Sequence, residues 1–219
     1  MLSFIVIILI TISLVAYGII EYRRHQDIIY EIPIRIHVNG TRGKSSVTRL
    51  IGAGLRAGRI NTITKVTGTY PRLILNDGSE AVIHRKEKAN ILEQLKIIKY
   101  AVDHQADALI IECMALQPGY QKITEKQMVH ATIGVITNVR LDHLDVMGPG
   151  LIDVAKALSY TIPAKGHLFT SENRVYSYLR KVADNKNCVS YQSDKKNVTN
   201  NEMTGFKYIE HKENVALAL

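Results

Sequence analysis

The chain is constrained most by residues 32–55, where a strand pattern, a glycine-rich turn and a helix pattern follow one another. The turn reads N-G-T-R-G-K-S-S from Asn39 to Ser46. Before it, isoleucine or valine occupies every second position, which predicts a β-strand, and after it apolar residues return at helical spacing. These positions are Ile32, Ile34, Ile36 and Val38 on the strand side and Val47, Leu50, Ile51, Gly54 and Leu55 on the helix side.

A strand, a glycine loop and a helix in this order are typical of a phosphate-binding loop. Glycines let backbone N–H groups converge on phosphate oxygens, the helix N-terminus is electropositive, and Lys44 adds a point charge. Ser45 is then expected to hold Mg²⁺. The general pattern G-x-x-x-x-G-K-[ST] has glycine where this chain has Val38, so only the shorter form G-x-x-G-K-S-S is present. The alternative is a plain turn with a solvated lysine, but the flanking strand and helix favour nucleotide binding.

The composition is that of a globular protein with an anionic partner. The 219 residues carry a formal charge of +8 and have a pI near 9.4, which suits a nucleotide, an acidic polymer or an anionic membrane. We do not expect nucleic acid as a partner, because the sequence has no zinc-finger spacing, no tryptophan and no basic patch interleaved with aromatic residues. Cys113 and Cys188 lie far apart and form no metal-ligand cluster, so we expect free thiols in a reducing cytoplasm.

The N-terminus predicts a membrane helix. Residues 2–20 contain no charge, and as a helix they would span about 28 Å, close to the hydrocarbon thickness of a bilayer. A signal peptide is the alternative, but no basic segment precedes the run and no small-x-small cleavage site follows it. Arg23 and Arg24 follow instead, so we expect a single-pass protein of the cell membrane, with residues 1–22 as the anchor and the rest cytoplasmic. Residues 26–31 are expected to be a short linker.

The remaining sequence alternates between strand and helix patterns, which predicts an α/β fold with a mainly parallel sheet flanked by helices. Asn76-Asp77-Gly78 between two short apolar runs predicts a hairpin. Strands are expected at 59–66, 73–75, 81–83, 107–112, 133–139, 167–170, 188–191 and 206–210, and helices at 89–106, 151–160 and 172–183. A charge cluster at 84–88 is expected to be a solvated loop.

Three candidate loops are expected at the ends of neighbouring strands: the glycine loop, Glu112, and Asn138 to Asp145. The common alternatives among P-loop proteins lack support. A GTPase needs N-K-x-D for base recognition, but N-V-R-L follows here, and an ABC-type ATPase needs a glycine-rich signature that the chain lacks.

These residues resemble the Mur-ligase superfamily of ATP-dependent amide ligases. G-T-R-G-K-S-S is similar to their G-T-N-G-K-[ST]-[ST], Glu112 falls at their strand-end glutamate, and N-V-R-L-D-H-L-D is similar to their N-x-x-x-D-H-L-D. Within that superfamily, K-V-T-G-T, I-I-E-C-M-A-L-Q-P-G-Y-Q, D-H-L-D-V-M-G-P and the apolar N-terminus resemble the poly-γ-glutamate synthase branch, from about residue 1 to the end.

The resemblance implies ATP and Mg²⁺ as cofactors and a role for each matching residue. Lys44, Glu112 and His143 are expected to be catalytic. Phosphate binding is expected of Gly40, Thr41, Arg42, Gly43, Lys44, Ser45 and Ser46, with Asn138 and Asp142 bracing the loop and Asn138 and Asn214 in the ATP site. Metal ligation is expected of Ser45, Glu112, His143 and Thr67, with Thr69 close by.

The chain also departs from the family pattern. The metal-bridging lysine of many members corresponds to Leu158, with Lys156 nearest, and the second asparagine of the adenine segment corresponds to Leu217. Residues 215–219 read as the start of a helix, so we expect residues 32–219 to form an ATP-binding domain that is incomplete at its C-terminus.

The leading hypothesis is therefore a ligase subunit that forms γ-glutamyl bonds through an acyl phosphate. Its expected partners are glutamate, poly-γ-glutamate, the lipid bilayer and other membrane subunits of a synthase. Two alternatives remain open: a membrane-anchored ATPase that drives polymer transport, and a non-catalytic module of the synthase.

Overall fold

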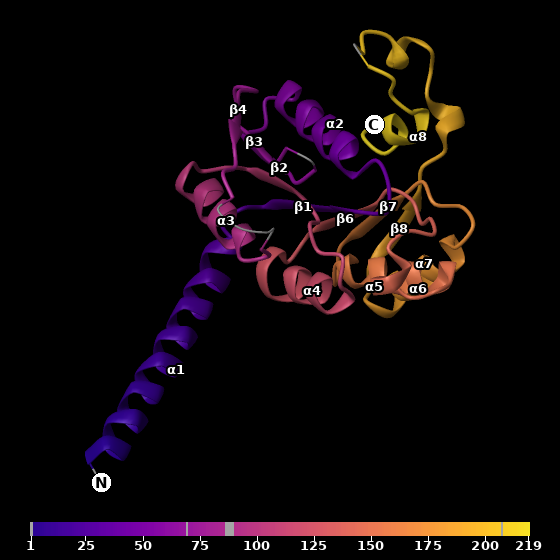
Figure 1. Ribbon diagram of the computed structural model, residues 1–219. Coiled ribbons are helices and arrows are strands. Elements are labelled where there is room, and N and C mark those ends of the chain that lie inside the picture. Colours follow the sequence, from indigo (N-terminus) through magenta and orange to yellow (C-terminus); the bar gives the residue numbers. More distant parts are fainter. Residues whose placement is uncertain (1, 69, 86–89, 207) are drawn as a thin grey trace.

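A single sheet forms the centre of the protein (Figure 1). The computed structural model describes residues 2–68, 70–85, 90–206 and 208–219, and within them eight strands pair in the order β4-β3-β2-β5-β1-β6-β7-β8. All neighbours from β2 to β8 are parallel, whereas β3 and β4 are antiparallel, so the predicted mainly parallel sheet is confirmed. The strands are β1 (Ile34–Asn39), β2 (Thr62–Val66), β3 (Arg72–Ile74), β4 (Glu80–Val82), β5 (Ala108–Glu112), β6 (Ile133–Ile136), β7 (His167–Thr170) and β8 (Val189–Gln192).

Helices cover both faces of this sheet. Helix α2 (Lys44–Ala57) and the short α8 (Lys212–Ala216) lie on one face, and α3, α4, α6 and α7 lie on the other (Figure 1). The second set comprises α3 (Glu93–Asp103), α4 (Pro118–Ile123), α6 (Leu151–Leu158) and α7 (Tyr176–Asn185), and the short α5 (Leu144–Met147) packs against α6. A π-helical turn, η1 (Thr124–Val129), continues α4, and 3₁₀ turns η2 (Ser159–Thr161), η3 (Lys195–Asn197) and η4 (Asn201–Met203) complete the described elements.

The N-terminal helix runs without interruption into the domain. Helix α1 (Leu2–Ile29) projects away from the sheet in Figure 1, and its last turn packs into the core, where Ile29 is fully buried. His25 Nε2 lies 2.9 Å from the carbonyl of Met128, and Gln26 donates to the carbonyl of Gln127 at 3.0 Å. The linker expected at 26–31 is therefore wrong for residues 26–29, because burial of Ile29 and these contacts with η1 stabilise helix up to Ile29, and only Tyr30 and Glu31 form a turn before β1.

Other expectations are corrected in detail. The strand expected at 206–210 does not form: of its described residues, Phe206 and 208–210 are irregular. An alternating pattern forms a strand only where a neighbouring strand accepts its backbone hydrogen bonds, and no described residue in this range pairs with the sheet. Helices α3 and α7 begin later than expected, at Glu93 and Tyr176, and residues 86–89 of the charge cluster and helix start lie outside the described residues. The hairpin of β3 and β4 is confirmed, with Leu73 opposite Ala81.

The polar side chains of β1 are buried rather than solvated. Because helices cover both faces of this central strand, Arg35, His37 and Asn39 all lie under α4 and η1, with at most 7% of each residue exposed. His37 Nδ1 lies 2.8 Å from Glu125 Oε2, and Glu125 Oε1 accepts from the backbone N–H of Ala131 at 2.9 Å. Alternating apolar and polar residues normally indicate a strand with one solvated face. Here the polar side chains of the strand have hydrogen-bond partners inside the protein instead.

His37 and Glu125 form a buried ion pair. Burial by itself would lower the pKa of His37, but the neighbouring groups of Cys113 and Glu125 outweigh it and raise the pKa to about 10. Cys113, the neighbour of His37, directly follows Glu112 in the sequence. The His37–Glu125 pair therefore lies close to the strand end that carries the candidate metal ligand.

This pair predicts a pH-dependent stability. Because the pKa of His37 rises on folding from 6.5 to about 10, its stabilisation is complete below pH 6.5 and is lost as pH rises through 10. The free energy of unfolding should fall over this window by up to about 1.4 kcal/mol per pH unit from this residue. Glu125→Gln should flatten that dependence in denaturant titrations followed by circular dichroism. Glu213→Gln, which breaks an exposed ion pair with Lys195, should leave it unchanged; an equal slope in wild type and Glu125→Gln would contradict the assignment.

Candidate nucleotide and metal site

The three candidate loops meet at one edge of the sheet, as the sequence predicted. Strand β1 lies between β5 and β6 and is parallel to both, so their carboxyl ends are adjacent. Val38 of β1 is opposite Glu112, and Asn39 is opposite Ile136. In open parallel α/β sheets, ligands bind at this edge.

The glycine loop is held at its start by the strand that precedes it. Asn39 is buried; its Oδ1 accepts from the N–H of Gly40 at 2.8 Å, and its Nδ2 donates to Gln121 Oε1 at 2.8 Å. Gly40 has φ +135°, and a Cβ there would lie 2.0 Å from Thr137 Oγ1, so only glycine fits. Asn39 was not among the predicted site residues, although a polar residue at the end of a central strand can indicate a position beside a ligand site.

A second set of contacts fastens the loop to the end of β6. The N–H of Thr41 donates to the carbonyl of Asn138 at 3.1 Å, and the N–H of Arg42 donates to Asn138 Oδ1 at 3.2 Å. The carbonyl of Arg42 accepts from Asn138 Nδ2 at 2.9 Å and from Thr137 Oγ1 at 2.6 Å. The side chain of Asn138 is thus engaged in bracing the loop. Thr137, which sequence reasoning did not single out, shares this role.

These contacts leave a defined set of free donors. In the described part of the chain, the backbone N–H groups of Gly43, Lys44, Ser45 and Ser46 have no hydrogen-bond partner, because they form the first turn of α2. Lys44 Nζ lies across the loop, 2.7 Å from the carbonyl of Gly40. Four converging N–H groups, a helix N-terminus and an ammonium group form a cradle that fits nucleotide phosphates.

Glu112 lies beside this cradle with two further predicted residues. Only 3% of Glu112 is exposed, and its carboxylate accepts from Ser45 Oγ at 2.9 and 3.0 Å and from the N–H of Thr67 at 2.6 Å. A serine hydroxyl in contact with a carboxylate offers the hard oxygen ligands that Mg²⁺ prefers. Thr67 contributes a backbone donor to this group, and Thr69 lies outside the described residues.

His143 lies on the neighbouring loop and contacts a different carboxylate. It adopts a left-handed conformation (φ +49°) at the start of α5, its side chain is 46% exposed, and its Nε2 lies 3.9 Å from Asp142 Oδ1. Asp142 in turn pairs with the Arg42 guanidinium at 3.1 Å. No three His, Cys, Asp or Glu side chains among the described residues form a metal-binding group, so a cation shared by Glu112 and His143 stays a prediction. Leu158 is buried in the apolar cluster of α6 and α7, a poor environment for a charged bridging group.

Asn214 is brought directly against the glycine loop. Its Oδ1 would lie 2.6 Å from a Cβ at Gly43, and its Nδ2 donates to Glu210 Oε1 at 2.7 Å. Leu217 packs into the apolar cluster under α2, which fixes α8 in this position. The candidate adenine-site residue and the phosphate loop are therefore adjacent, although almost the whole chain separates them in sequence.

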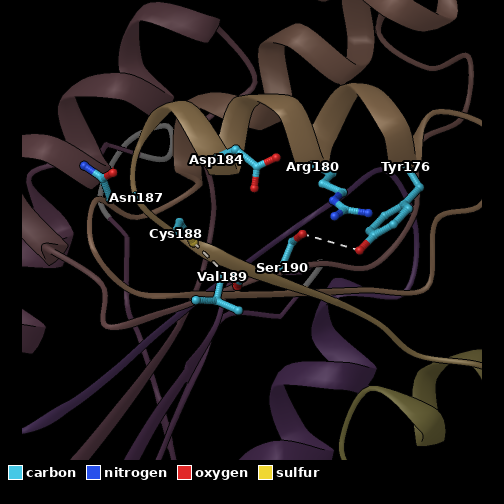
Figure 2. A pocket seen from close by; sticks show the side chains of 7 residues that line it. All are labelled: Tyr176, Arg180, Asp184, Asn187, Cys188, Val189 and Ser190. Atoms are coloured by element: carbon cyan, nitrogen blue, oxygen red, sulfur yellow. Dashed lines mark hydrogen bonds between the residues drawn. The ribbon is translucent and has the colours of Figure 1, made fainter.

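A separate hollow lies away from the candidate nucleotide and metal site. It has a volume of about 540 Å³ and lies between α7 and β8, where the Tyr176 hydroxyl is 3.3 Å from Ser190 Oγ (Figure 2). Three strand spacings, roughly 14 Å, separate β8 from β1. The hollow is lined by Tyr176, Arg180, Asp184, Asn187, Cys188, Val189 and Ser190, none of which was a predicted site residue.

Comparison with known protein families identifies the family to which this chain belongs. The model of the Mur ligase middle domain matches residues 38–218. The chain belongs to the Mur ligase middle-domain family. Two curated relatives are similar to this chain over most of the chain's length. The capsule biosynthesis protein CapB of Bacillus anthracis is 44% identical over 95% of this chain and 46% of its own length. The PGA synthase CapB of Bacillus subtilis (strain 168) is 40% identical over 92% of this chain and 52% of its own length.

Solved structures share the Mur ligase fold at lower identity. A bifunctional folylpolyglutamate synthase/dihydrofolate synthase with Mn, AMPPNP and L-glutamate bound superimposes with a TM-score of 0.64 at 16% identity, over 80% of this chain and 46% of that one. E. coli FolC in complex with DHPP and ADP gives 0.59 at 17% identity, over 78% and 45%. The chain thus spans about half the length of the relatives and structures that it matches.

The cradle predicts different effects on nucleotide binding for two glycine-to-alanine changes, one in the loop and one within α2. Gly43→Ala places a Cβ against Asn214 at a residue with φ +80°, so it should distort the loop and weaken binding of a fluorescent ATP analogue by about tenfold or more. Gly54→Ala adds a methyl group to open space within α2, so it should leave binding unchanged and stabilise the helix by up to about 1 kcal/mol. Equal nucleotide affinity of Gly43→Ala and wild type would show that the loop does not bind phosphate.

Proposed function

We propose that this protein is the ATP-dependent ligase subunit of a synthase that joins glutamate residues through γ-glutamyl bonds. The observation that carries the proposal is the cradle of four free N–H groups and Lys44 beside the Ser45–Glu112 contact. Its family membership supports amide ligation, and the names of its two relatives support capsule polymer or PGA synthesis.

In this proposal the chain binds ATP as a substrate at the start of α2. The N–H groups of Gly43 to Ser46 and the Lys44 ammonium hold the phosphates, and they stabilise charge that develops as the γ-phosphoryl group moves. Ser45 and Glu112 hold Mg²⁺, which would neutralise phosphate charge when bound. His143 and Thr67 are proposed as further groups at this metal, with Asn214 beside the nucleotide.

The reaction then proceeds in two displacements. An oxygen of a glutamate γ-carboxylate attacks the γ-phosphorus, and the bond to the β–γ bridging oxygen breaks, which releases ADP. The α-amine of a second glutamate attacks the acyl phosphate carbon, loses a proton, and phosphate leaves as the amide forms. Thr137 and Asn138 keep the loop in position during both steps, because their contacts with Arg42 do not involve the phosphate donors.

We also propose that residues 1–22 anchor the protein in the cell membrane and that residues 32–219 form the cytoplasmic ATP-binding domain. Support comes from α1, in which an 18-residue window within Ser3–Ile29 has a mean hydropathy of 2.7 and none of that window is buried by the rest of the chain. Arg23 and Arg24 follow the apolar run, as expected for a cytoplasmic flank. Other membrane subunits of the synthase are proposed partners at this helix.

Trapping with hydroxylamine tests the proposed chemistry. Membranes that contain the protein, given ATP, Mg²⁺ and poly-γ-glutamate, should form a hydroxamate, because hydroxylamine intercepts an acyl phosphate. Lys44→Ala should abolish it and weaken nucleotide binding by about tenfold or more, at least 1.4 kcal/mol. Lys181→Ala, an exposed lysine of α7, should change neither. Phosphate release without hydroxamate would instead support a transport ATPase, and turnover only after addition of a complementary polypeptide would support a non-catalytic module.

A double-mutant cycle tests whether Glu112 and His143 share one cation. Glu112→Gln keeps the shape but removes the charge, so it should weaken Mg²⁺-dependent binding of an ATP analogue far more than binding without metal. If His143 ligates the same ion, the effects of Glu112→Gln and His143→Ala should be strongly non-additive. The measurement is Mg²⁺ titration of analogue binding in wild type, both single variants and the double variant. Additive effects would place the two residues in separate sites.

A further inference from the structure

Arg42 has a side chain that the phosphate cradle does not use. Its N–H donates to Asn138 Oδ1 and its carbonyl accepts from Thr137 and Asn138, so its backbone is already engaged. Its guanidinium group extends to the rim of the loop, where it contacts Asp142 at 3.1 Å while 66% of the side chain remains exposed. An exposed arginine beside the proposed phosphate cradle is a cation available to a second anionic substrate.

Two more arginines lie on the neighbouring strand-end loops. Strands β1, β6 and β7 are adjacent, and Arg42, Arg140 and Arg174 follow them by three or four residues. Arg174 Nη2 donates to the carbonyl of Val139 at 2.6 Å, and 61% of its side chain is exposed. Arg140 is exposed and, within the described part of the chain, its side chain makes no hydrogen bond or ion pair.

Two of these side chains contact one short segment, residues 139–142, which itself contains Arg140. Arg174 contacts the segment at Val139, Arg42 contacts it at Asp142, and Arg140 lies between them. Three residues of extended chain span at most about 11 Å, so the Cα atoms of Val139 and Asp142 are no further apart than that. We call Arg42, Arg140 and Arg174 the arginine row.

The nearby acids leave much of this charge available. Glu172 is buried, and its carboxylate accepts from the N–H groups of Val139 and Arg174, both at 2.7 Å. Asp142 pairs with Arg42, and Asp145 is exposed on the first turn of α5. Only the Asp142 contact is a close pair, at 3.1 Å, whereas Arg174 Nε is 3.8 Å from Glu172, and exposed guanidinium edges remain on all three loops.

We propose that the arginine row binds the carboxylates of an acidic polymer, a γ-linked glutamate chain, and leads its end to the phosphate cradle. This inference rests on the proposed function and assigns the polymer a binding surface. Guanidinium groups bind carboxylates through paired hydrogen bonds, and a row of three matches a ligand with repeated carboxylates better than it matches single glutamate. The row begins at the rim of the loop that would hold the γ-phosphate, so it would also offset repulsion between two anionic substrates.

The test measures binding of a fluorescein-labelled decamer of γ-linked glutamate to the full chain in detergent, by fluorescence anisotropy. Arg42→Gln, Arg140→Gln and Arg174→Gln should each weaken binding by about three- to tenfold, and the triple variant by about a hundredfold or more. Arg180→Gln removes the same charge from the exposed face of α7, in the hollow of Figure 2, and should leave affinity unchanged. Asp142→Asn should tighten binding, because it releases Arg42 from its internal partner, and a merely structural effect would not produce this gain.

Several results would overturn the inference. They are absence of decamer binding to wild type, unchanged affinity of the arginine variants, an effect of Arg180→Gln as large as theirs, or no gain from Asp142→Asn. Equal competition by a single-stranded DNA of the same charge would show a general polyanion surface and would also overturn it. A fluorescent ATP analogue, measured on the same preparations, separates the two proposals. Failure of wild type to bind the analogue contradicts the proposed function, whereas normal analogue binding with unchanged decamer affinity contradicts the arginine row alone.

Discussion

Burial of β1 on both faces is the constraint on which the rest of the structure depends. A central parallel strand has no solvent side, so each of its polar side chains needs a partner inside the protein, and an unpaired one would destabilise the fold. His37 is paired with Glu125 and Asn39 with Gln121, and both partners come from α4 and η1. Glu125 lies in the π-helical turn η1, and such turns are rare and often occur beside functional sites.

The same strand connects the apolar N-terminal helix to the candidate site. Helix α1 contacts η1 through His25 and Gln26, η1 contacts β1 through Glu125, and β1 ends at the glycine loop. Because Ile29 belongs to the core, the apolar helix and the domain share one hydrophobic cluster. The last turn of the helix therefore packs against the domain, at the opposite end of β1 from the phosphate cradle (Figure 1).

At the other end of β1, the glycine loop is held by contacts that leave its phosphate donors free. Asn39 binds Gly40, Asn138 binds Thr41 and Arg42, and the next four N–H groups have no partner within the described residues. Such a division keeps the loop preorganised, so little reorganisation is needed when an anion binds. Asn214 adds a third support from the far end of the chain, against Gly43, where a Cβ would lie 2.6 Å from its Oδ1.

The sequence by itself determined the local elements and the edge of the sheet at which chemistry is expected. Alternating isoleucine and valine identified β1, the glycine loop identified the start of α2, and strand-end placement of Glu112 and Asn138 followed from the α/β pattern, because these signals depend on neighbours in sequence.

The tertiary structure decided what depends on neighbours in space. It converted the expected linker into helix through burial of Ile29, left residues near 206–210 without a strand partner, and buried His37 against Glu125. It also separated the contacts of Glu112 from those of His143 and brought Arg42, Arg140 and Arg174 to one segment, since the order β1-β6-β7 exists only once the sheet has formed.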